Sequence, residues 1–90
     1  MKRNDRFFLK NVGDTWFLQC SEMSEQKLIF LNETGVFLWE KLMECETKED
    51  LVNELVASYD VHRSLAEEDV KGFLAFLAEN GCLIQKGVSD

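Results

Sequence analysis

Three short runs of apolar residues follow one another in the first third of the chain. They are Phe7-Phe8-Leu9, Trp16-Phe17-Leu18 and Leu28-Ile29-Phe30-Leu31, each bounded by polar residues. Short runs rich in aromatic and branched side chains are typical of β-strands. Gly13-Asp14 between the first two runs favours a hairpin. A polar link over residues 21–26 leads to the third run, so we predict a three-stranded antiparallel meander.

The spacing of apolar residues becomes helical after residue 32. Asn32 is a suitable N-cap, because its side chain can accept a hydrogen bond from a free amide of the first turn. The residues that follow recur at i, i+3, i+4 and i+7, which is one face of a helix. They are Gly35, Leu38, Trp39 and Leu42. We therefore predict that a first helix begins after Asn32.

Capping signals predict two further helices. Thr47 followed by Asp50 is a shortened capping box, and an apolar stripe over residues 51–59 follows it. Ser64 and Glu67 fit the full capping box, so we predict that the third helix begins there and directs Val70, Phe73, Leu74 and Leu77 toward the core. Gly81 should end this helix, because glycine readily adopts the left-handed conformation. Residues 82–85 are expected to form a short extended tail.

The order of these elements predicts an α+β fold. A three-stranded antiparallel sheet followed by three helices is expected to form a winged-helix-like arrangement. The chain has 90 residues, of which 46% are hydrophobic, and we interpret it as a single domain over residues 1–90. Enzymes with a deep, dry cleft are usually larger, so the size favours a binding or adaptor module.

The charge and the apolar runs limit the partners of the chain. It has 10 Lys and Arg against 17 Asp and Glu, so the net charge is −7. Nucleic-acid affinity depends largely on cations, and we expect no nucleic-acid partner. The basic residues Lys2, Arg3 and Arg6 are expected to form a solvated tail. No apolar run approaches the roughly 20 residues of a membrane span, so we expect neither a membrane segment nor a signal peptide.

We find no residue set that predicts catalysis or metal binding. His62 lies two residues from Ser64 at a loop-to-helix junction, which is poor geometry for a nucleophile and its base. Cys20, Cys45 and Cys82 are widely spaced and indicate free, partly buried thiols in a reducing cytoplasm. Structural zinc needs four ligands at suitable spacing. We therefore predict no enzyme activity, no metal and no cofactor.

The three strands do not alternate between apolar and polar residues, as strands with one solvated face do. If Ile29 and Leu31 face the helices, then Leu28 and Phe30 face away from them. Either the helices and the C-terminal tail cover both faces of the sheet, or the outer face is a docking surface for a partner or a second copy. The third strand is also an edge of the meander, to which a peptide can add as a further strand.

Several motifs resemble one family. Leu31-Asn32-Glu33-Thr34-Gly35, followed by Leu38-Trp39, resembles the L-N-x-T-x-x-x-[IL]-W signature of the pyrroloquinoline quinone biosynthesis protein D (PqqD) family. Residues 47–52 with Tyr59 resemble its second helix, and residues 69–83 resemble its third helix and the glycine stop. The resemblance covers about residues 6–84. The chain lacks the proline that quinone-pathway members often carry before the third strand, so the pathway and its product stay open.

The resemblance implies a precursor-peptide recognition element. Such a peptide chaperone binds the leader segment of a ribosomally made precursor and presents it to a modifying enzyme, often a radical S-adenosylmethionine (SAM) enzyme. The leader is implied to add to the third strand, in a groove that this strand forms with the third helix. The implied strand surface consists of Lys27, Leu28, Ile29, Phe30 and Leu31, and the implied groove wall consists of Asp69, Val70, Phe73 and Phe76. The acidic composition favours a leader with Lys or Arg beside its apolar residues.

Two other interpretations stay open. A winged-helix DNA-binding regulator should have a basic recognition helix, whereas the third helix carries only Lys71 in its body, with Arg63 just before it. Its acidic residues are Glu67, Glu68, Asp69 and Glu79. The other alternative is a scaffold that forms a homodimer through the apolar sheet face and binds no peptide.

Overall fold

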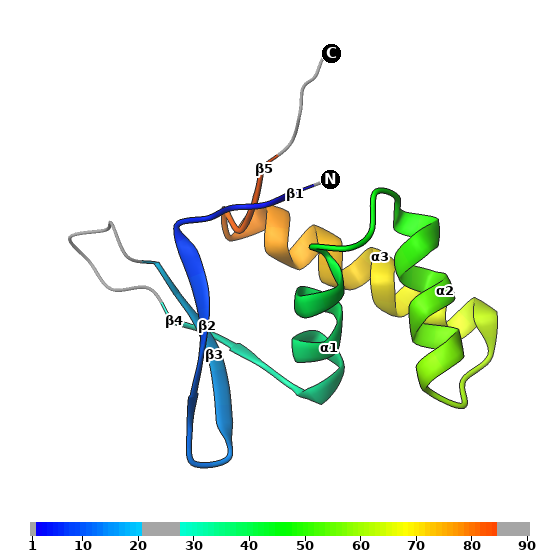
Figure 1. The fold of residues 1–90 in the computed structure, drawn as a ribbon, viewed down its shortest axis with the longest axis horizontal. Helices are drawn as coiled ribbons and strands as arrows, with labels where there is room; N and C mark the ends of the chain where they lie inside the picture. Colours follow the sequence, from blue (N-terminus) through cyan, green and yellow to red (C-terminus); the bar gives the residue numbers. More distant parts are fainter. Residues whose placement is uncertain (1, 21–27, 85–90) are drawn as a thin grey trace.

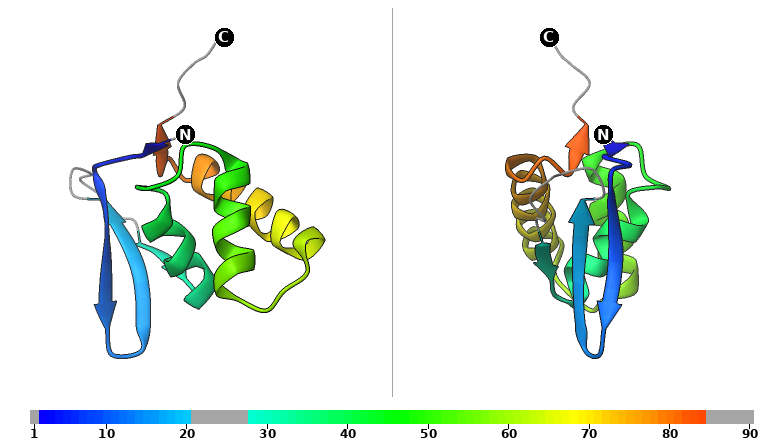
Figure 2. Two further views of the ribbon diagram at one scale, coloured as in Figure 1. Left: turned by 45° about the vertical axis from the view of Figure 1, so that its right-hand side comes forward. Right: turned by 90° about the vertical axis from the view of Figure 1, so that its left-hand side faces the viewer.

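The computed structural model describes residues 2–20 and 28–84 (Figure 1). The elements are β1 Lys2–Arg3, β2 Phe7–Val12, β3 Thr15–Cys20, β4 Leu28–Leu31, α1 Glu33–Lys41, α2 Lys48–Ser58, α3 Arg63–Glu79 and β5 Leu83–Ile84. Strands β2, β3 and β4 form an antiparallel sheet in that order. Helix α1 lies between the β2–β3 hairpin and α2 in Figure 1 and in the left-hand view of Figure 2. The predicted α+β fold, with this sheet followed by three helices, is confirmed.

The predicted hairpin is present and has a two-residue loop. Val12 pairs with Thr15, and Gly13 has a φ of 61°, in the left-handed region that favours glycine. The Asn11 side-chain amide donates hydrogen bonds to the carbonyl oxygens of Gly13 (3.0 Å) and Thr15 (3.2 Å). Gly13 thus has the backbone conformation expected of this loop, and Asn11 adds two side-chain hydrogen bonds to it.

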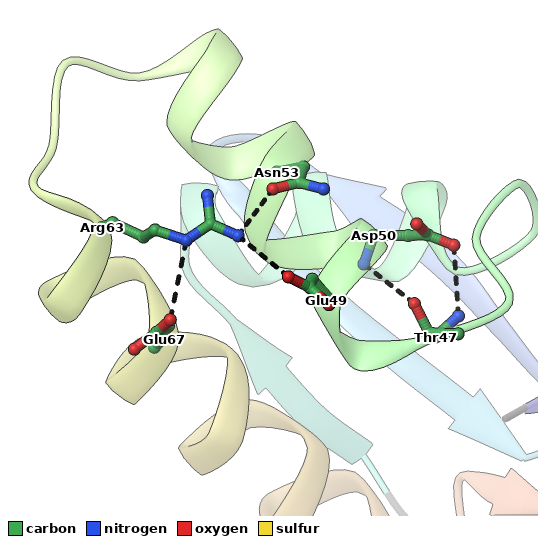
Figure 3. A network of polar contacts seen from close by, with 6 residues as sticks. All are labelled: Thr47, Glu49, Asp50, Asn53, Arg63 and Glu67. Carbon is green, nitrogen blue, oxygen red and sulfur yellow. Dashed lines mark hydrogen bonds and ion pairs between the residues drawn. The ribbon is translucent and has the colours of Figure 1, made fainter.

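Two of the three predicted helix starts are confirmed. The Asn32 side chain accepts a hydrogen bond from the Gly35 amide at 2.8 Å, as expected of an N-cap. At α2, the Thr47 hydroxyl accepts from the Asp50 amide at 3.1 Å, and the Asp50 carboxylate accepts from the Thr47 amide at 3.3 Å (Figure 3). These bonds form the predicted capping box.

The predicted start of the third helix is wrong. Helix α3 begins at Arg63, with His62 at the N-cap and no side-chain cap bond, so Ser64 lies inside the first turn. Arg63 joins this turn to α2, because its guanidinium donates to Asn53 at 2.8 Å and lies 3.6 Å from the Glu49 carboxylate (Figure 3). It also lies 3.6 Å from Glu67. The cap was predicted from Ser64 and Glu67 alone, and a pattern of neighbouring residues gives no information on contacts between two helices.

One core joins the sheet to the three helices. It combines Leu18 and Ile29 of the sheet with side chains from all three helices. The largest fully buried side chains are Trp39, Leu18, Leu38, Leu51, Leu55, Leu77, Val70 and Cys82. All three cysteines are free and buried, which agrees with the expectation of unpaired thiols.

The two ends of the described chain pair with each other, and we call β1 and β5 together the terminal ribbon (Figure 2). Arg3 donates a hydrogen bond to the Trp39 carbonyl oxygen at 3.2 Å, and its guanidinium lies 4.7 Å from the centre of the Trp39 ring. The prediction of a tail is therefore wrong for Lys2 and Arg3, which form β1, while the Lys2 side chain is exposed as predicted. The predicted glycine stop is confirmed, because Gly81 has a φ of 76°. The extended tail is also confirmed over Leu83–Ile84, while Gln85 lies outside the described residues.

Candidate functional site

Strand β4 forms an edge of the three-stranded sheet. Its neighbour in the sheet is β3, and no described strand pairs with its other side. The described C-terminal residues do not occupy this edge, because β5 pairs with β1. The backbone groups of β4 that face away from β3 are therefore open to an incoming strand.

The register shows which residues of β4 present these backbone groups. Val12 and Thr15 flank a two-residue turn, and the backbone groups of residues in these positions bond to each other. Along antiparallel strands, such hydrogen-bonded pairs alternate with non-hydrogen-bonded pairs. The even-numbered residues of β3 therefore bond to β4, where their partners are the odd-numbered residues. It follows that the N–H and C=O groups of Leu28 and Phe30 point toward the open edge.

The side chains of β4 divide between two faces, as the sequence predicts. Ile29 is buried in the core and Leu31 is half-buried, whereas Leu28 is 44% exposed and Phe30 is 62% exposed. The Phe30 ring lies 5.9 Å from the ring of Phe17 on the same outer face. Lys27, which the resemblance implies at the start of this strand, lies outside the described residues.

A hollow of about 190 Å³ lies between β4 and α3. Its lining residues are Phe30, Leu31, Asn32, Gly35, Phe73 and Phe76. Phe76 is 39% exposed and Phe73 is half-buried against the core, so aromatic surface is accessible from solvent. The hollow can therefore accept an apolar side chain from a strand that adds to β4.

The four residues implied as the groove wall differ in their placement. Phe73 and Phe76 line the hollow, and Asp69 is exposed on α3 one turn before Phe73. Val70 is 0% exposed and packs in the core, because it lies on the inner side of the helix. We therefore leave Val70 out of the contact surface and assign it a structural role.

Sequence reasoning missed two residues of the hollow, Asn32 and Gly35. Both were predicted only as parts of the first helix. A Cβ atom at Gly35 would lie 3.3 Å from Asn32 Oδ1 and 3.3 Å from Leu31 Cβ, so the absence of a side chain lets α1 start close to β4. In the sequence, the signal for this close approach was a glycine among the apolar residues of the predicted first helix.

The outer face of the sheet is not covered by the described helices or tail. Phe8 is 39% exposed, Leu28 and Phe30 are exposed, and Phe17 is half-buried between strands. The Lys10 ammonium lies 5.4 Å from the centre of the Phe8 ring. Of the two alternatives for this face, coverage by the chain's own elements is wrong for the residues described.

The described residues present no metal cluster of His, Cys, Asp and Glu side chains. Burial, and after it the negative charges of Glu54, Asp50 and Glu44, raise the pKa of the Cys45 thiol. This thiol is therefore a poor nucleophile near neutral pH. Within residues 2–20 and 28–84, no helix is long and apolar enough to cross a membrane.

Comparison with known proteins bears on the open edge and the hollow beside it. The family model described as "Coenzyme PQQ synthesis protein D (PqqD)" matches residues 22–83. The chain belongs to the PqqD family. This confirms the resemblance carried by the motif at residues 31–39. A search of curated proteins finds no match for the sequence.

Two solved structures are similar to this PqqD-family chain over nearly its full length. TbiB1, in complex with the TbiA(beta) leader peptide, is 28% identical, with a TM-score of 0.75 and coverage of 100% of both chains. Lasso peptide synthetase B1, complexed with the leader peptide, is 21% identical, with a TM-score of 0.74 and coverage of 93% of this chain and 96% of that chain. The second match shows that the two chains share a fold.

Proposed function

We propose that this PqqD-family chain binds the leader segment of a ribosomally made precursor peptide and presents the precursor to a modifying enzyme. The observation that supports this most directly is the open edge of β4 beside an aromatic hollow on α3. The 28% identical relative TbiB1, described in complex with a leader peptide, has the same fold over its whole length.

In this proposal the leader adds to β4 as a further antiparallel or parallel strand. The backbone groups of Leu28 and Phe30 bond to it, at about 1 kcal/mol for each hydrogen bond. One apolar side chain of the leader enters the hollow beside Phe73 and Phe76. Ordering a disordered leader costs about 2–5 kcal/mol. The strand bonds and the buried side chain together offset this cost.

The charge of the chain favours a basic leader. Glu68, Asp69 and Glu79 are exposed on α3, and the whole chain has a net charge of −7. Lys or Arg residues beside the apolar residues of the leader would be attracted to this surface. The same charge disfavours the winged-helix DNA-binding alternative, because α3 would repel phosphates.

In the same proposal the chain is an adaptor and carries no catalytic step. The modifying enzyme supplies the chemistry, and the family resemblance implies a radical SAM enzyme for this partner. The three free, buried cysteines are typical of proteins from a reducing compartment, so we propose that binding takes place in the cytoplasm.

The exposed outer face supports a homodimeric scaffold as a second candidate. Phe8 and Phe30 present aromatic surface there to solvent, and a second copy could cover it. Light scattering with and without a leader peptide separates the two functions. A dimer whose mass stays the same when the leader peptide is added would favour the scaffold, because a scaffold of this kind binds no peptide.

The test begins with the short open reading frames beside the gene. The N-terminal half of the encoded precursor is titrated into the native chain by calorimetry. Phe76→Ala should weaken binding by about 10- to 100-fold, because it removes an aromatic side chain from the hollow. Met43→Ala is the matched control, since Met43 is 73% exposed and does not line the hollow.

Circular dichroism must accompany each titration, so that a loss of binding is not confused with unfolding. Phe73→Ala should lose both stability and affinity, because Phe73 packs against the core as well as lining the hollow. Absence of binding to the native chain, or equal binding by folded Phe76→Ala, would contradict the proposed site.

A further inference from the structure

Gly72 occupies an exposed position in the interior of α3. Inside a helix, only proline is less favourable than glycine. The two described glycines with a positive φ are Gly13 and Gly81, so the backbone at Gly72 does not require a glycine. A Cβ atom at this position would meet no other atom within 4 Å. The structure of the free chain therefore offers no reason for a glycine at residue 72.

The other helical glycine of the described chain, Gly35, has such a reason. A Cβ atom there would lie 3.3 Å from atoms of Leu31 and Asn32, tighter than ordinary van der Waals contact. Gly35 is thus explained by packing within the chain. Gly72 differs because the space beside it is open to solvent.

Gly72 does not line the hollow but is next in sequence to a residue that does. It precedes Phe73 and comes one turn before Phe76, both of which line the hollow. With 3.6 residues per turn, its Cα lies about 40° around the helix from that of Phe76, on the side away from the core. A side chain at this position would project from the helix about 40° from the direction of Phe76, and its Cβ atom would meet no other atom within 4 Å. It would stand at the margin of the path of a strand added to β4.

We propose that Gly72 leaves the backbone of α3 bare so that the bound peptide can approach the helix closely. This inference rests on the proposed function and adds a specificity-determining position to it. The ligand is an extended peptide that pairs with β4, places one apolar side chain in the hollow, and packs its next segment against the helix at Gly72. Glycine permits such an approach because it has no Cβ atom. A methyl group at residue 72 holds the peptide away from α3.

A glycine swap separates binding from helix stability. Gly72→Ala alone adds helix propensity and should raise Tm by about 4–8 °C. Ala75→Gly lowers the helix propensity at an exposed position. Residue 75 lies about 100° around the helix from Phe76 and farther from the hollow. The double variant Gly72→Ala/Ala75→Gly keeps the composition of the chain and should melt near the native Tm. Ala75→Gly alone is the control for the loss of propensity.

The probe is a peptide selected on the native chain from an mRNA-displayed library of random 16-residue peptides. Its dissociation constant is then measured for all four proteins by calorimetry. We expect Gly72→Ala and the double variant to bind about tenfold more weakly than the native chain, which corresponds to about 1.4 kcal/mol. Ala75→Gly should bind as the native chain does at a temperature where it is fully folded.

The outcomes distinguish this inference from the function on which it rests. If the native chain selects no peptide, or selects peptides whose binding is unaffected by Phe76→Ala, the proposed function fails. If the native chain binds through Phe76 and the double variant binds equally well, the role of Gly72 is overturned and the proposed function stands. A weaker double variant with a native Tm supports both.

Discussion

The terminal ribbon and the β4 edge are both short stretches of strand, but one is paired within the chain and the other is open. β1 pairs with β5, whereas β4 has β3 on one side only among the described residues. The difference arises where α3 ends. The amide of Cys82 donates to the Leu77 carbonyl oxygen at 2.8 Å, and the Asn4 side chain donates to the Gly81 carbonyl oxygen at 2.8 Å. These bonds direct β5 toward β1, so that β5 does not pair with the open side of β4.

The comparison shows that equal backbone chemistry can serve stability at one edge and recognition at another. In the terminal ribbon, Arg3 closes the contact by packing over Trp39. At β4, exposed Phe30 and Phe76 flank the unpaired backbone groups instead. An unpaired edge beside apolar surface is an aggregation hazard unless a partner covers it. This supports a peptide as the partner of β4.

A proline inside β4 should destabilise the whole domain. Ile29 is buried and its amide bonds to β3, so Ile29→Pro removes both a ladder bond and a core side chain. We expect a loss of about 3–5 kcal/mol, which is a large fraction of the stability of a small domain. Urea denaturation followed by circular dichroism measures this loss.

Leu28→Pro is the matched control for that proline. Its amide points to the open edge and it is the first residue of the strand, where proline is tolerated. The variant should stay folded and lose peptide affinity about fivefold, because one hydrogen bond to the incoming strand disappears. Similar unfolding midpoints for Ile29→Pro and the native chain would refute the assigned register.

A change in the terminal ribbon should affect stability without affecting recognition. Arg3→Ala removes the contact with the Trp39 ring and the hydrogen bond to the Trp39 carbonyl oxygen. We expect a loss of about 1–2 kcal/mol in the free energy of unfolding. Peptide affinity should be unchanged at a temperature where the variant is folded. Lys2→Ala, at an exposed position of the same strand, is the control and should change stability little. A loss of affinity in folded Arg3→Ala would show that the two edges are coupled.

The smallest expected effect concerns the acidic border of the hollow. Asp69 is exposed one turn before Phe73, so Asp69→Asn should weaken the binding of a basic leader by about two- to fivefold. The difference between Asp69→Asn and the native chain should shrink as salt is raised from about 50 to 500 mM, since exposed charges are screened. Glu46→Gln, between α1 and α2, serves as the control. An affinity that is independent of salt in both proteins would remove the electrostatic part of the proposal.

Much of the local structure was predictable from the residues. Asn32, Thr47 with Asp50, and Gly81 mark element ends through bonds within a few residues, and the structure has them as predicted. The start of α3 was mispredicted, because the contacts of Arg63 with Asn53 and Glu49 on α2 are distant in sequence.

The candidate site was predictable only in part. The apolar run at β4 predicted exposed Leu28 and Phe30, because side chains alternate between the faces of a strand. The helical stripe predicted Val70 in the core, as the structure has it, whereas the resemblance implied Val70 in the groove wall. The stripe gave no sign that Phe73 and Phe76 line the hollow, because the direction from which β4 approaches α3 is not encoded in the helical period. Gly72 carried no signal until the space around it was known.

The kind and order of the elements, the family and the acidic charge could all be predicted from the amino-acid sequence. They depend on residue types and on interactions between neighbours along the chain. The three-dimensional structure was needed to show that β5 pairs with β1 and that β4 has an open edge among the described residues. It was also needed to show that Phe30, Phe73 and Phe76 line one hollow. Strand pairing and helix packing join residues far apart in sequence. Their outcome depends on how the whole core fills, and no local pattern specifies it.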